Sequence, residues 1–381
     1  MAGIYIHIPF CKQACHYCDF HFSTSLKYKD EMLQSIRKEI QRQKHYLENQ
    51  KIETIYFGGG TPSLLNSDEI DKLLETIQTN FELIAHPEVT LEANPDDLDL
   101  RKLRDLRNTS VNRLSIGVQS FFDEDLKWMN RAHLAKEAEY AIKRAQDFGL
   151  ENITIDLIYG YPLLSDEKWK QNIQNVLDFD IPHISSYSMT VEPKTALAGF
   201  INKGHQKAMD DLQSANQFQY LMAELSVNGF EHYEISNFAK PEQYSKHNTN
   251  YWRGVHYLGI GPSAHSFNGE SRQWNVANNA KYLSALQRNE IPFEIEKLTS
   301  ENRYNEYLMT SLRTQWGVDL KTVETAYGTE QKSNLLASAD EYLDKNWLAL
   351  TENKLVLTQA GKLYADLIAS ELFITENELQ K

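Results

Sequence analysis

The chain has 381 residues, of which 41% are hydrophobic and 24% charged, and its formal net charge is −14 with a pI near 5.4. These proportions are typical of a globular protein with a buried core, and they exclude disorder along most of the length. The acidic excess argues against nucleic acid as a partner, because phosphate recognition depends on clustered Lys and Arg.

The first residues show no pattern of a secretory signal peptide. The apolar run over residues 4–10 is interrupted by His7 and Pro9, and the chain contains no run of roughly 18 apolar residues. The mean hydropathy of −0.54 agrees with this. We therefore expect a cytoplasmic protein. Peripheral association with a membrane is compatible with this composition, and no pattern indicates an oligomeric state.

The chemical motif closest to the N-terminus is a group of cysteines. Cys11, Cys15 and Cys18 are the only cysteines of the chain and are spaced C-x3-C-x2-C. An odd number within one loop indicates a metal or cluster site in a reducing compartment rather than disulfides. Three thiolates can ligate three irons of a cubane cluster and leave the fourth iron open. The alternative is zinc, which would need His16 or His21 as a fourth ligand.

From residue 3 to about residue 190, β-rich runs alternate with segments of helical period, which is typical of βα units around a parallel sheet. Strands are expected at residues 3–8, 54–57, 88–91, 113–118, 153–157 and 183–187. Helices are expected at residues 29–46, 68–80, 98–108, 136–148 and 167–177, with Ser67 as the N-cap of the second. Six units are fewer than the eight of a closed TIM barrel. The sequence therefore predicts an α/β fold with a partial (β/α)6 barrel.

Glycine or polar residues follow several of these strands, where ligands bind in parallel βα folds. They are Gly58, Gly59, Gly60, Thr61 and Pro62 after the second strand, Glu92 after the third, Gln119 after the fourth and Asp156 at the fifth. An alternative is that the glycines serve only to form a tight turn and that each polar residue only caps a helix. Their repeated position favours a shared pocket. Tyr5 is expected to face that pocket beside the cysteines, because strand residues alternate between faces.

Beyond residue 230 the pattern changes twice. Residues 231–295 read as a loop-rich segment, and long loops are often functional. From residue 296, helices at 301–312, 333–345 and 360–372 flank a hairpin of residues 348–350 and 355–357. This order predicts a small α+β domain of winged-helix type. Its acidic excess favours a docking or lid role over DNA binding. The expected domains are thus 1–230, 231–295 and 296–381, with residues 375–381 frayed.

The cysteine spacing resembles the hallmark of the radical S-adenosylmethionine (SAM) superfamily, and Gly58 to Pro62 resembles its GGGTP motif. The resemblance implies a [4Fe-4S] cluster on Cys11, Cys15 and Cys18, whose open iron binds the amino and carboxylate groups of SAM. One electron from the cluster then breaks a sulfonium carbon–sulfur bond. The residues that the resemblance places against SAM are Tyr5, Tyr17, Gly59, Gly60, Thr61, Glu92, Gln119, Arg131, Asp156 and Ser188.

Within the superfamily, the stretch Tyr5 to Cys18 resembles the branch that contains oxygen-independent coproporphyrinogen III oxidase and the HemW heme chaperones. The oxidase has a further cysteine where this chain has Phe20, and it has an N-terminal extension before the cluster, whereas only ten residues precede Cys11 here.

The run from His247 to Trp252 matches the HNxxYW motif of the HemW proteins. The resemblance implies heme binding, with His247 as the candidate axial ligand, and delivery of heme to acceptor proteins such as respiratory-chain enzymes. Decarboxylation of coproporphyrinogen III is the alternative enzymatic activity, and a redox-inert zinc-binding module is a third hypothesis. The resemblance implies SAM binding, and the residues leave open whether SAM is cleaved.

Overall fold

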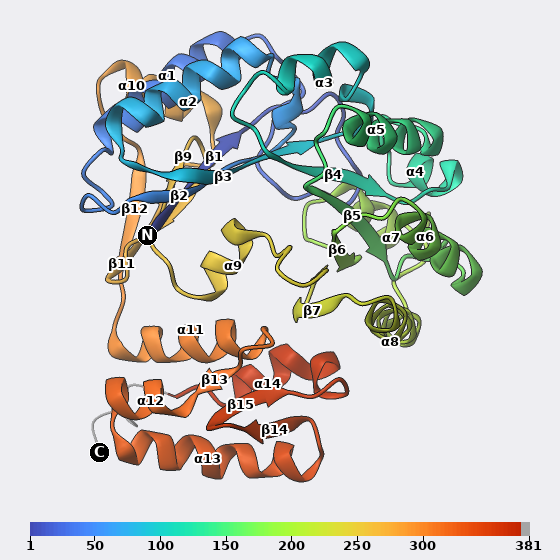
Figure 1. Cartoon of the computed structure of the whole chain (residues 1–381), viewed down its shortest axis with the longest axis vertical. Coiled ribbons are helices and arrows are strands. Elements are labelled where there is room, and N and C mark those ends of the chain that lie inside the picture. The colour runs from blue at the N-terminus through green and yellow to red at the C-terminus, as the bar shows by residue number, and fades with distance from the viewer. Residues whose placement is uncertain (375–381) are drawn as a thin grey trace.

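The computed structural model describes residues 1–374 and contains two β-sheets (Figure 1). Six parallel strands form the centre of the larger sheet: β1 (Ala2–Ile8), β2 (Ile52–Gly59), β3 (Leu83–Ala93), β4 (Arg113–Gln119), β5 (Ile153–Tyr159) and β6 (His183–Ser188). They run side by side in chain order, and β1 and β6 are not paired with each other. The predicted partial barrel is therefore confirmed.

Helices cover the outer, convex side of these strands (Figure 1). They are α1 (Lys29–Arg42), α2 (Ser67–Asn80), α3 (Leu100–Leu106), α4 (Asp123–Trp128), α5 (Ala135–Asp147), α6 (Asp166–Asp178), α8 (Asp211–Val227) and α10 (Asn279–Gln287). The short helix α7 (Ala196–Asn202) instead contacts His16 between the cysteines. Two short 3-10 helices, η1 (Pro62–Leu64) and η2 (Pro95–Asp97), follow β2 and β3. Ile4, Ile6 and Ile8 of β1 are fully buried in the core, whereas Tyr5 and His7 line a cavity. Successive side chains of β1 thus point alternately into the core and toward the inner side of the barrel.

Helix α2 begins one residue earlier than expected. Its N-cap is Asn66, whose side chain accepts a hydrogen bond from the backbone N–H of Glu69 at 2.9 Å. The Glu69 carboxylate accepts one from the backbone N–H of Asn66 at 2.8 Å, which completes a capping box. The prediction of Ser67 as the cap was wrong because only Asn66 has a glutamate three residues later.

Residues 231–295 were expected to be loop-rich, but the structure places short strands there that extend both edges of the sheet. β8 (Asn237–Ala239) and β7 (Glu231–Glu234) lie beyond β6, and β9 (Tyr257–Ile260), β10 (His265–Phe267), β11 (Ser271–Asn275) and β12 (Phe293–Lys297) lie beyond β1. Helix α9 (Lys246–Trp252) connects the two edges on the inner side of the barrel (Figure 1). Strands of three to five residues are too short to establish a clear period of two.

The C-terminal residues form a separate small core. The elements are α11 (Ser300–Leu312), β13 (Val318–Asp319), α12 (Leu320–Tyr327), α13 (Thr329–Asp344), β14 (Leu348–Thr351), β15 (Lys354–Leu357), η3 (Gly361–Tyr364) and α14 (Ala365–Glu371). The antiparallel order β13-β15-β14 and the helix order are those of a winged helix. The sequence prediction missed β13 and α12.

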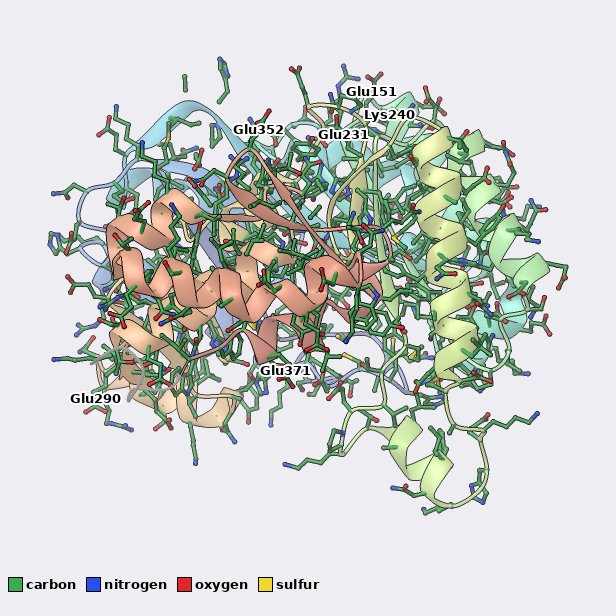
Figure 2. All side chains as sticks on the ribbon, turned by 90° about the horizontal axis from the view of Figure 1, so that it is seen from below. Glu151, Glu231, Lys240, Glu290, Glu352 and Glu371 are labelled. Atoms are coloured by element: carbon green, nitrogen blue, oxygen red, sulfur yellow. The ribbon has the colours of Figure 1, made fainter. Side chains whose placement is uncertain are left out.

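The surface of this C-terminal unit carries acidic side chains. Figure 2 shows the molecule from below, with the C-terminal unit toward the viewer and the exposed Glu352 and Glu371 labelled. The expectation of fraying for residues 375–381 falls outside the described residues. The part of the chain that the structure describes contains no helix with the length and apolar character of a bilayer-spanning segment.

Candidate functional site

A cavity of about 410 Å³ lies at the carboxyl ends of the parallel strands. The loop that carries Cys11, Cys15 and Cys18, which we call the cysteine loop, folds over these strand ends. The cavity brings together nearly all of the residues predicted for the cluster and SAM: Cys11, Cys15, Tyr17, Cys18, Gly59, Gly60, Thr61, Glu92, Gln119, Arg131, Asp156 and Ser188. They meet there because the carboxyl ends of parallel strands share one edge of a sheet. We refer to this space as the cysteine cavity.

The glycine run holds the cysteine loop close to β2. The backbone N–H of Gly60 donates to the carbonyl of Ile8 at 2.9 Å, and that of Thr61 donates to the carbonyl of Phe10 at 2.6 Å. A Cβ atom on Gly60 would lie 2.5 Å from the Phe10 oxygen, so a larger residue would push the loop away. Gly59 has a φ of +105°, which disfavours any residue with a side chain.

The three thiols are free and partly exposed within the described residues. Burial raises the pKa of Cys11 and raises that of Cys18 to about 12, and a bound metal cation would favour their thiolate forms. The donor set fits an iron–sulfur cluster, in which each thiolate bonds a different iron.

The zinc alternative finds no support in the positions of its proposed fourth ligands. His16 Nδ1 hydrogen-bonds to the carbonyl of Trp128 at 2.8 Å, and His21 Nε2 hydrogen-bonds to Asn279 Oδ1 at 2.7 Å. Among residues 1–374, no three His, Cys, Asp or Glu side chains are gathered as ligands of one metal ion.

Arg131 places a half-buried cation beside the loop of the three cysteines. Its Nη1 donates to Cys15 Sγ at 3.4 Å, and its Nη2 donates to Asn94 Oδ1 at 2.7 Å and to the carbonyl of Gly117 at 2.8 Å. Its Nε is buried without a hydrogen-bond partner among the described residues. The guanidinium therefore keeps one donor for an anionic group such as a carboxylate.

Two half-buried carboxyl groups line the cavity, and neither forms an ion pair within the described part of the chain. Tyr56 donates to Glu92 Oε1 at 2.9 Å, and Ser115 donates to Asp156 at 3.3 Å. Burial raises the pKa of Glu92 to about 8 and that of Asp156 to about 7. Carboxyl oxygens in this setting suit the hydroxyl groups of a ribose, which donate hydrogen bonds.

Sequence reasoning missed several residues of the cysteine cavity, among them Tyr56, Asn94, Ser115, Ser185, Tyr187 and Asn248. Tyr56 precedes Gly58 by two residues, and Ser115 precedes Gly117 by two. Side chains two apart on a strand share a face, so this spacing was a signal that could have found them. Asn248 could not be found in this way, because it comes from α9.

A second, larger cavity of about 880 Å³ lies between the sheet edge β9–β11, the end of α9 and the C-terminal unit. Tyr5 lines this space and not the cysteine cavity, and its predicted contact with SAM stays a prediction. Tyr251 and Trp252 of the HNxxYW motif also line it. We refer to it as the interdomain cavity. Asp19 and Phe20 line both cavities, so the two are adjacent.

His247 lines neither cavity and is 2% exposed. Its Nδ1 lies 2.8 Å from the Thr54 hydroxyl and its Nε2 lies 2.9 Å from the Tyr251 hydroxyl. A Cβ atom on Gly3 would lie 3.2 Å from the imidazole, so the ring is packed directly on β1. In this structure both ring nitrogens have a hydroxyl partner, and the predicted role of His247 as axial ligand stays a prediction.

The sequence matches two family profiles, the radical SAM superfamily over residues 5–176 and the HemN C-terminal domain over residues 298–364. It is 34% identical to the heme chaperone HemW of Bacillus subtilis, over 95% of this chain and 97% of that protein. It is 32% identical to the heme chaperone HemW of Mycobacterium tuberculosis, over 97% and 94% of the two chains. The fold is similar to that of coproporphyrinogen III oxidase (HemN) from Escherichia coli, with a TM-score of 0.84, 22% identity, and coverage of 98% of this chain and 90% of that one.

Proposed function

This chain belongs to the radical SAM superfamily and, within it, to the family of the heme chaperone HemW, and we propose that it binds heme and delivers it to acceptor hemoproteins. The acceptors in this proposal are proteins such as respiratory-chain enzymes. Three free cysteines and no disulfide among the described residues suit work in the reducing cytoplasm.

The cysteine cavity supports binding of a [4Fe-4S] cluster and SAM. Cys11, Cys15 and Cys18 would hold three irons, and the unpartnered Nε of Arg131 would meet a carboxylate. Glu92 and Asp156 would accept hydrogen bonds from ribose hydroxyls. The cluster, when bound, supplies one electron to the sulfonium group of SAM. The remaining predicted contacts stay part of this proposal; they are Tyr5, Tyr17, Gly59, Gly60, Thr61, Gln119 and Ser188.

The interdomain cavity is the observation that carries the heme proposal. Its volume of about 880 Å³ lies within the range of about 300–1,000 Å³ that is typical of ligand pockets. Tyr251, Trp252, Tyr257 and Trp316 supply flat apolar surface with polar edges, which suits a macrocycle that carries carboxylates. It adjoins the cysteine cavity at Phe20, so cargo and cluster would be neighbours.

The test is an anaerobic transfer assay. The reconstituted protein is loaded with ferrous or ferric heme, freed of excess heme, and mixed with an apo-hemoprotein whose activity returns only when it acquires heme. We expect activity to return faster than from the same amount of heme on serum albumin. Equal rates would contradict delivery. A parallel reaction with reductant, SAM and coproporphyrinogen III is expected to give no sustained vinyl product, and sustained product would instead support the oxidase activity.

A further inference from the structure

We propose that heme occupies the interdomain cavity with His265 as the axial ligand of its iron and Arg253 as the partner of a propionate. This inference deepens the proposed heme binding and rests on it. It assigns ligation to a residue outside the HNxxYW motif, and it gives His247 a positioning role behind Tyr251.

Among the histidines that line the interdomain cavity, His265 is the one whose ring is free in the described structure. His7 has Nε2 bonded to the carbonyl of His21 at 2.8 Å and Nδ1 at 3.3 Å from the Tyr5 hydroxyl. His21 has Nε2 bonded to Asn279, which fixes the orientation of its ring and leaves only Nδ1 without a hydrogen bond. Neither ring nitrogen of His265 takes part in a hydrogen bond with residues 1–374, and the side chain is exposed to the cavity. Iron ligation needs such a free imidazole nitrogen.

The surroundings of His265 fix its position and favour its neutral form. It lies on β10, opposite Trp274 of β11, and the two rings are roughly parallel with centroids 6.1 Å apart. Partial burial, together with the charge of Arg272, lowers the pKa of His265 below its ordinary value. The direction of this shift favours the neutral imidazole, which is the form that binds iron.

Three arginines line the cavity, and they differ in whether their guanidinium groups already have a protein partner. Arg272 is paired with Glu306 at 2.8 Å, and Arg303 donates to the carbonyl of Leu298 at 2.8 Å. Arg253 lies over the ring of Trp316, 4.1 Å from its centroid, and takes part in no ion pair among the described residues. A stacked guanidinium without an acid partner is ready to pair with a carboxylate.

Tyr251 connects α9, the helix that carries the HNxxYW motif, to this site. Its hydroxyl is held by His247 Nε2, and its ring makes an edge-on contact with Tyr257 at a centroid distance of 4.6 Å. Tyr251 and Tyr257 both line the interdomain cavity. Tyr251 of the HNxxYW motif would thus form part of the wall of the heme site, with His247 holding it in place. The axial ligand would come from strand β10.

The experiment is an anaerobic titration of the full-length, cluster-loaded protein with hemin, followed by absorption and electron paramagnetic resonance spectroscopy. The variants are His265→Ala, His265→Cys and Arg253→Gln, with His86→Ala as a control for an exposed histidine outside both cavities. A SAM-perturbed cluster signal in every variant verifies that the barrel is folded.

We expect His265→Ala to bind hemin about tenfold more weakly, with an altered Soret band that added imidazole restores. His265→Cys is expected to give the spectrum of thiolate ligation, and Arg253→Gln should weaken binding with an unchanged spectrum. A native affinity and spectrum in His265→Ala, while the unmodified chain binds hemin, would overturn this assignment and leave the chaperone function standing. Failure of the unmodified chain to bind hemin would instead reject the proposed function itself.

Discussion

The hydroxyl of Tyr251 lies 2.9 Å from Nε2 of His247, so one turn of α9 joins a buried imidazole to the wall of the interdomain cavity. The other ring nitrogen is bound to Thr54 of β2. The motif helix is thereby anchored to the centre of the sheet while its last residues reach the cavity.

We predict that His247→Ala lowers the free energy of unfolding by roughly 1–3 kcal/mol, because it leaves the buried Thr54 hydroxyl without its partner. Heme binding should weaken while the ligation spectrum is retained. Chemical denaturation and a hemin titration measure the two effects, and Tyr251→Phe, which removes only the hydroxyl, should reproduce the weaker binding with a smaller loss of stability. Loss of an axial ligand band in His247→Ala would restore His247 as the ligand.

Replacement of any one of Cys11, Cys15 and Cys18 by alanine should abolish the iron–sulfur absorption after anaerobic reconstitution, because the cubane then keeps only two protein ligands. Iron and sulfide analysis provides the measurement. Ser23→Ala on the same loop is the control and should retain the cluster. Stoichiometric zinc with no iron in the unmodified chain would favour the zinc hypothesis.

Arg131→Gln should lower the reduction potential of the cluster, because it removes a positive charge that lies 3.4 Å from Cys15 Sγ. A redox titration followed by electron paramagnetic resonance measures the shift. Arg101, whose side chain is 88% exposed on the outer surface, provides the matched control as Arg101→Gln. An equal potential in both variants would argue that Arg131 has no electrostatic role at the cluster.

The raised pKa of Glu92 predicts a pH-dependent stability. Its pKa rises from 4.5 to about 8 on folding, mainly through burial, so the folded state holds the proton more tightly than the unfolded state. Stability from this group is complete below pH 4.5, falls as pH rises toward about 8, and is constant above it.

Glu92→Gln removes this titration and should therefore raise the melting temperature at pH 8 by roughly 1–3 °C in the absence of SAM. At the same time SAM binding should weaken about tenfold, because a carboxyl acceptor is lost. Thermal melts between pH 5 and pH 9 and calorimetric SAM titration test both effects. Glu75→Gln, on the exposed side of α2, should change neither.

The barrel and the cysteine cavity could be predicted from the sequence because their signals are local. Buried strands such as β1 and β5 have period-two or continuous apolar patterns, and residues just past each strand meet at one edge. The strands β7 to β12 are short and pair across long stretches of chain, so no local pattern revealed them.

Whether a given histidine side chain faces the interdomain cavity could not be predicted from the sequence. The motif drew attention to His247, but whether an imidazole faces a cavity or a neighbouring hydroxyl depends on contacts with Thr54, almost two hundred residues earlier in the chain. His265 stands in a short stretch between Ala264 and Ser266 that contains no motif we recognised. Only the pairing of β10 with β11 brings it to the cavity.

The central claim is that this radical SAM fold carries heme as its cargo. The most direct measurement is the amount of heme, iron and sulfide that stay with the reconstituted chain after gel filtration under anaerobic conditions. The account predicts that one heme and one [4Fe-4S] cluster remain with each chain and that SAM perturbs the signal of the reduced cluster. A chain that retains the cluster while all heme elutes separately would contradict it.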